Sequence, residues 1–155
     1  MKKFFKYIVL LILFAPALRA QVYTHPIVGI AGEYVGSCLV AGCSGTYYDN
    51  GGAGGNYSNN IGFPAPGPIY RVFCPDAVGM CMRATFNSFS IQGGFGCPSD
   101  FFRVINSSTQ NGPILFSGCG TGAIGPFTGT ANGCLSMQFR ANASVVGTGW
   151  DATLS

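Results

Sequence analysis

After residue 44 the chain is divided into short segments in which apolar and polar residues alternate, and none shows a helical period over ten residues. In segment 80–86, for example, Met80, Met82, Ala84 and Phe86 fall on one face. A period of two is typical of a half-buried β-strand. Such one-sided strands bury their apolar faces by stacking, so we expect an all-β sandwich of two sheets. The expected strands are TYYD from Thr46, IYRVFC from Ile69, MCMRATF from Met80, FFRVI from Phe101, PILF from Pro113, CLSMQFR from Cys134 and GWDATL from Gly149.

Glycine-rich connections separate these segments, among them YDNGGAGGN, IGFPAPGP and NSSTQNG. Asn50-Gly51 is a strong hairpin signal and needs no ligand to explain it, although Asp49 and Asn50 could also belong to a ligand loop. Residues 51–55 do not resemble a phosphate-binding loop, because no Lys-Ser/Thr pair follows them. We expect Tyr47, Tyr48, Tyr57 and Trp150 to pack, although exposed aromatic residues would suit a sugar ring.

The first twenty residues have the three-part layout of a secretory signal peptide: lysines, then an apolar run, then small residues ending before Gln21. The apolar run is too short for a membrane-spanning helix of about twenty residues. We therefore expect a secreted, extracellular protein without a membrane span. Residues 21–42 are interpreted as a leader or a short edge element, and residues 43–155 as the folded domain.

The charge of the remaining chain is low. Beyond Arg19 there are four arginines and five acidic residues, and no lysine. Nucleic-acid binding depends on neutralising several phosphates, so it is not expected. Electrostatic binding to an anionic membrane surface fails for the same reason.

Seven cysteines would lie in an oxidising compartment, where disulfides persist. None forms a CxxC pair and His25 is the single histidine, so a zinc site is not indicated. Cys81 and Cys134 each open an apolar segment and could pair if those strands are neighbours. Because seven is odd, at least one thiol is free, pairs with another molecule, or meets a partner in sequence that is absent here.

Five segments in this order and spacing resemble a CUB domain, specifically the CUB-like domains of secreted bacterial proteins. They are CSGTYYDNGGAGGNYSNN, FCP, RATFNSFSI, CPSDFFRVINSSTQNGPILFSGCG and NGCLSMQFRANASVVGTGWDATLS. The resemblance implies a disulfide-stapled, jelly-roll-like sandwich of two antiparallel sheets. It implies the disulfides Cys43–Cys74 and Cys97–Cys119. If Cys81 and Cys134 also pair, Cys38 is left over, either as a free thiol or in an intermolecular disulfide.

Many CUB domains bind calcium through a Glu and two Asp, and the matching positions here are Gln92, Asp100 and Asn142. One carboxylate remains, and calcium affinity rises with ligand charge, so we expect weak or absent binding and no other cofactor. The alternative for Asp100 is to accept hydrogen bonds from backbone N–H groups. Asn142 is expected to do the same in the last loop.

No catalytic motif occurs, and the one histidine lies in the unpatterned segment, so we do not expect an enzyme. The resemblance implies a non-catalytic module for extracellular protein or carbohydrate recognition and adhesion. Two alternatives stay open. The chain could be a structural component of an extracellular assembly, or a fragment of a larger secreted protein such as a peptidase.

Overall fold

A computed structural model describes residues 21–27, 33–35, 45–62, 67–75, 78–130 and 133–155. Strands make up all of its regular structure in these residues. The expected signal peptide, Cys38 and Cys43 lie outside them. Among the described residues, no helix is long and apolar enough to cross a membrane.

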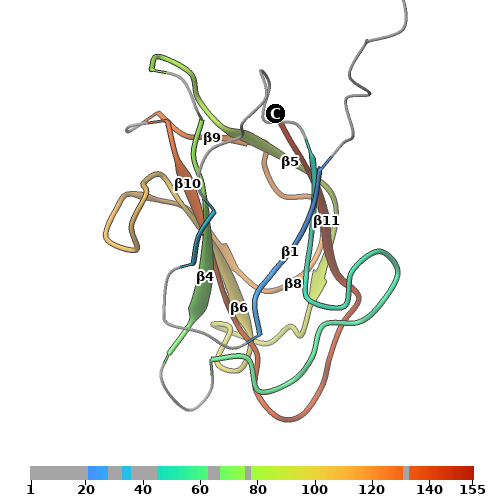
Figure 1. Cartoon of the computed structure of the whole chain (residues 1–155). Helices are drawn as coiled ribbons and strands as arrows, with labels where there is room; N and C mark the ends of the chain where they lie inside the picture. Colours follow the sequence, from blue (N-terminus) through green and yellow to red (C-terminus); the bar gives the residue numbers. More distant parts are fainter. Residues whose placement is uncertain (1–20, 28–32, 36–44, 63–66, 76–77, 131–132) are drawn as a thin grey trace, which may run out of the picture.

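The strands form two stacked sheets (Figure 1). The first sheet has the order β1-β3-β11-β5-β8, and β9 also pairs with β5. The second has the order β2-β4-β10-β6-β7. The strands of the first sheet are β1 Gln21–Thr24, β3 Gly45–Tyr48, β5 Arg83–Ile91, β8 Gly120–Thr121, β9 Phe127–Thr128 and β11 Gly149–Leu154. Those of the second are β2 Glu33–Val35, β4 Ile69–Phe73, β6 Phe101–Ile105, β7 Ile114–Gly118 and β10 Leu135–Arg140.

The prediction of an all-β sandwich is confirmed, and every segment predicted as a strand overlaps one. The sheets are mixed rather than purely antiparallel, because β1 pairs with β3 and β2 pairs with β4 in parallel. Strand β1 shows that the segment before residue 43 contributes an edge element to the sandwich.

Large rings fill the space between the two sheets. Trp150 of β11 lies with its ring centroid 4.6 Å from that of Phe102 in β6 and 5.0 Å from that of Phe139 in β10. Tyr47 of β3 and Phe89 of β5 extend this layer, and all five side chains are buried. Such offset and edge-to-face packing stabilises the core beyond simple area burial.

Two details of the strand prediction are wrong. The alternating pattern places Met80 on the buried face, but β5 begins at Arg83 and Met80 is exposed. In β10, Ser136 and Gln138 were expected to face solvent, yet both are buried. Strand β10 lies at the centre of its sheet, and Ser136 Oγ donates a hydrogen bond to Ser107 O, so its outer face is also covered.

A candidate binding surface at one end of the sandwich

Three loops meet at one end of the sandwich, in the lower part of Figure 1, and we call this region the loop end. It consists of residues 49–62, 92–100 and 141–148. The backbone N–H of Asn60 donates to Asn142 O (2.7 Å), and that of Tyr57 donates to Gly147 O (3.3 Å). These bonds hold the first and last loops against each other.

The side chains of Tyr57 and Asp100 connect all three loops. The Tyr57 hydroxyl donates to Asp100 Oδ2 (2.6 Å) and accepts from the backbone N–H of Gln92 (2.8 Å). Asp100 Oδ1 accepts from the backbone N–H of Asn142 (2.8 Å). Burial, together with the hydrogen bond to Asp100, raises the pKa of Tyr57 to about 12, so the phenol stays neutral.

The structure therefore brings together the three positions considered for calcium, Gln92, Asp100 and Asn142. They do not fit the ion. Each oxygen of the single carboxylate already accepts a hydrogen bond, and Asn142 Oδ1 accepts two from Ser144. Gln92 Oε1 is buried and unpartnered within the described residues, but it carries no charge. Calcium affinity depends on ligand charge, and the carboxylate of Asp100 is occupied by one backbone N–H, that of Asn142, and by the Tyr57 hydroxyl, so the geometry favours the alternative in which Asp100 accepts hydrogen bonds from the protein.

Phe95 stands out at the tip of loop 92–100, where its side chain is fully exposed. The disulfide Cys97–Cys119, with 5.6 Å between Cα atoms, fixes this loop against the strand region that follows β7. Cys97 has a φ of 50°, a left-handed conformation that non-glycine residues seldom adopt. On the neighbouring loop, Val145 is 54% exposed. Phe95 is not among the site residues predicted from the sequence. The feature that could have indicated it is a large apolar side chain inside the glycine-rich run GGFGC.

The disulfides differ in part from the expected set. Cys97 pairs with Cys119, as the resemblance implied. Cys74 pairs with Cys134, so the expected Cys43–Cys74 bond is wrong. The suggested Cys81–Cys134 pairing is wrong for the same reason, and Cys81 is a free, exposed thiol. Strands β4 and β10 are neighbours in one sheet, which brings Cys74 and Cys134 together just beyond paired Phe73 and Leu135.

His25 was expected in an unpatterned segment, but it is buried in the core. Its Nε2–H donates to Ile69 O (3.1 Å), and Nδ1 accepts from the Tyr47 hydroxyl. Burial lowers the pKa of His25 to about 3. A neutral, fully enclosed imidazole is a structural element and cannot reach a substrate at the surface. The described residues also hold no group of three or more His, Cys, Asp or Glu that could bind a metal.

We compared the chain with known protein families, sequences and structures. No family model matches the chain. Embryonic protein UVS.2 of Xenopus laevis is 35% identical over 69 residues, which is 44% of this chain but 13% of that protein, so the chain spans a small part of this relative.

Among solved structures, the MASP-1 CUB2 domain bound to Ca²⁺ has a TM-score of 0.55 and 18% identity, covering 72% of this chain and 90% of that one. The CUB1-EGF-CUB2 region of human MASP-1/3 has a TM-score of 0.57 and 14% identity, covering 86% of this chain and 40% of that one. The full extracellular region of zebrafish Gpr126/Adgrg6 has a TM-score of 0.57 and 16% identity, covering 88% of this chain and 14% of that one. At these identities the likeness establishes the fold.

Proposed function

We propose that this chain, which adopts the CUB-domain fold, is an exported, non-catalytic module that recognises an extracellular protein partner through its loop end. Export is supported by the signal-peptide layout of residues 1–20 and by two disulfides, which persist in oxidising compartments. One similar structure is itself described as an extracellular region.

The exposure of Phe95 carries this proposal. An aromatic side chain in water on a loop braced by a disulfide gains free energy when a partner's pocket covers it. Aromatic residues of this kind dominate binding energy at protein interfaces. The bracing reduces the entropy that binding would otherwise cost, because the loop is already held in one conformation.

The sparse charge of the chain fits the same proposal. Beyond Arg19 no lysine occurs, so the loop end has little means of steering a charged ligand from a distance. Affinity would then depend on contact at Phe95 and Val145 rather than on long-range attraction, and it would change little with salt.

The test is an array of extracellular receptor ectodomains probed with the exported chain, followed by affinity measurement for each hit. We expect Phe95→Ser to weaken binding by at least about tenfold, as for a hot-spot residue. Val78→Ser is the matched control, because Val78 is equally exposed but lies in the loop before β5, at the opposite end of the sandwich in Figure 1. Equal binding by Phe95→Ser and the wild type would overturn the proposal.

A second candidate function, a linked component of an extracellular assembly, is favoured by the thiol of Cys81. This side chain is exposed and has no disulfide partner, whereas Cys38, first considered for this role, lies outside the described residues. Non-reducing gels of the exported protein test it. A dimer that disappears in Cys81→Ser but persists in Cys38→Ser would support assembly through Cys81, and a monomeric wild type would exclude it.

A further inference from the structure

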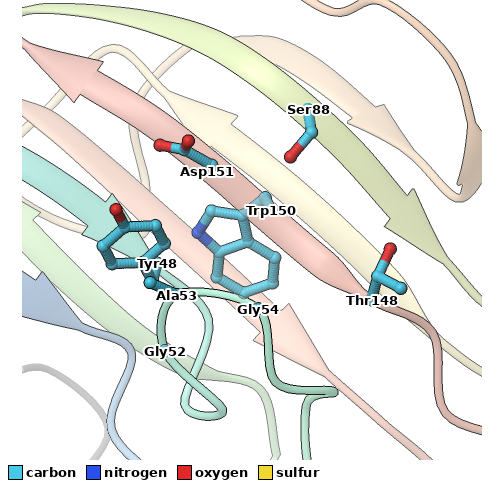
Figure 2. A pocket seen from close by; sticks show the side chains of 8 residues that line it. All are labelled: Tyr48, Gly52, Ala53, Gly54, Ser88, Thr148, Trp150 and Asp151. Carbon is cyan, nitrogen blue, oxygen red and sulfur yellow. The ribbon is translucent and has the colours of Figure 1, made fainter.

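A hollow of about 250 Å³ lies against the first sheet (Figure 2), and Phe95 is not among the residues that line it. The loop after β3 forms one side of it, and strands β3, β11 and β5 form its floor. The side chains of Tyr48 and Asp151 are half-buried there, while Ser88 and Thr148 are exposed. Its lining residues are Tyr48, Gly52, Ala53, Gly54, Ser88, Thr148, Trp150 and Asp151.

The register of the sheet places three of these side chains in one row. Asp151 of β11 pairs with Tyr48 of β3 on one side and with Ser88 of β5 on the other. Directly opposed residues share a face of the sheet, and their Cβ atoms lie about 5 Å apart. The row therefore offers a tyrosine ring, a carboxylate and a hydroxyl, in that order.

A bulge in β5 supports the carboxylate at the centre of this row. The pairing of β5 with β11 shifts register after Asp151, so that Asn87 has no partner of its own in the ladder. Asn87 Nδ2 donates to Asp151 Oδ1 (3.2 Å) and to Thr153 Oγ1 (3.1 Å). Within the described residues, Asp151 Oδ2 accepts no hydrogen bond, so it is available to a ligand. Bulges commonly re-aim side chains in this way next to functional sites.

The loop that borders the hollow is held in place by Asp49. Its Oδ1 accepts from the backbone N–H of Gly51 (2.6 Å), and its Oδ2 accepts from that of Trp150 (3.1 Å). Gly149 permits this contact, because a Cβ there would lie 1.8 Å from Asp49 Oδ2 and its φ is +70°. The hollow is thus formed before any ligand arrives. The Asn50-Gly51 turn does not make the expected hairpin, since β3 and β4 belong to different sheets.

We propose that this hollow binds one neutral sugar ring. The Tyr48 ring would stack on the apolar face of the sugar, and sugar hydroxyls would donate to Asp151 Oδ2 and exchange hydrogen bonds with Ser88 and Thr148. The volume suits a single ring, since it lies below the roughly 300 Å³ at which sites for drug-sized ligands begin. No lining residue is cationic, and the carboxylate of Asp151 repels anions, so phosphate and sulfate groups are disfavoured.

The site is independent of the proposed protein-binding role of Phe95, and the two are tested separately. We would titrate the ¹⁵N-labelled exported chain with the methyl glycosides of glucose, galactose, mannose, N-acetylglucosamine and fucose. The expected result is a saturable shift of the amide signals of Gly52, Gly54 and Ser88 with at least one of them. Tyr48→Ala should then weaken binding by up to roughly tenfold, whereas Tyr48→Phe, which keeps the ring, should retain it.

Asp151→Asn should weaken the same binding by roughly tenfold or more, because a charge-assisted hydrogen bond is lost. Tyr70→Ala is the matched control, since Tyr70 is a half-buried tyrosine of β4 in the opposite sheet. Dispersed spectra show that each variant is folded. The proposal is overturned if none of the five glycosides gives a saturable shift, or if Tyr48→Ala binds as the wild type does. It is equally overturned if Nα-acetyl-lysine amide saturates these signals and the glycosides do not, because the site would then recognise an ammonium group.

Discussion

The hydroxyl of Tyr57 donates a hydrogen bond of 2.6 Å to Asp100 Oδ2, joining two buried residues that are 43 positions apart. Because the same carboxylate also accepts the backbone N–H of Asn142, one contact determines how the first and last loops meet the start of β6. The shape of the loop end, and with it the presentation of Phe95, therefore depends on a neutral phenol that donates to a buried carboxyl oxygen.

Replacing Tyr57 by phenylalanine should lower the free energy of unfolding by about 1 to 3 kcal/mol, because Asp100 Oδ2 would be buried without a donor. Urea denaturation of the wild type and the variant measures this difference. Tyr70→Phe is the control, since no described contact uses that hydroxyl, and it should change stability by less than about 0.5 kcal/mol. A loss of the same size in both variants would contradict the role assigned to Tyr57.

Calcium should not change the stability of the wild type, because Asp100 is the one carboxylate at the site. The double variant Gln92→Glu with Asn142→Asp supplies two more. At 10 mM calcium the free energy of unfolding of this variant should be roughly 1 to 3 kcal/mol higher than in EDTA, for a dissociation constant on the order of 0.1 to 1 mM. Thermal unfolding with calcium and with EDTA makes the comparison. Stabilisation of the wild type by calcium would contradict the conclusion that Gln92, Asp100 and Asn142 do not fit the ion.

The strand prediction succeeded where alternation along the chain reflects burial on one face. Phe102 and Val104 are buried and flank half-buried Arg103, as a period of two requires. It failed in β10, because the burial of Ser136 and Gln138 depends on neighbours that are distant in sequence. A local pattern carries no information on whether a strand lies at the centre or the edge of its sheet.

Long-range strand pairing also explains which features of the sites could not be predicted from the sequence. Cys74 and Cys134 are 60 positions apart, and their proximity follows from the β4–β10 pairing, which no local signal reveals. The row of Tyr48, Asp151 and Ser88 exists only once three separate strands are in register. The sequence suggests that Asp100 accepts backbone N–H groups, but its partners, the N–H of Asn142 and the hydroxyl of Tyr57, lie 42 and 43 positions away and could not be named in advance.

Removing the Cys74–Cys134 disulfide should cost about 4 kcal/mol in the chain-entropy estimate, and removing Cys97–Cys119 about 3 kcal/mol, since the first closes the longer loop. The paired alanine variants, compared by urea denaturation, test this order. Peptide mapping of the unreduced protein checks the connectivity directly. A peptide that links Cys81 to Cys134 would contradict the structure.

Acid should destabilise the protein through His25. Its folded-state pKa of about 3 lies below the usual value of 6.5 because the ring is buried, so the unfolded chain binds a proton that the folded chain excludes. This contribution is fully present above pH 6.5 and is lost as the pH falls toward 3. The free energy of unfolding should decrease by about 1.4 kcal/mol for each pH unit within that window.

His25→Gln separates this effect from the titration of the carboxylates. Glutamine keeps a donor and an acceptor near Ile69 O and the Tyr47 hydroxyl but does not titrate. Burial raises the pKa of Asp49, which gives a pH dependence of the opposite sign, but wild type and variant share that contribution. The variant is expected to be less stable at pH 7, and the difference between the two proteins should shrink as the pH is lowered from 6.5 to 4. If the difference stays constant across that range, His25 is either already protonated in the folded state or exposed to solvent, and the enclosed imidazole described above is wrong.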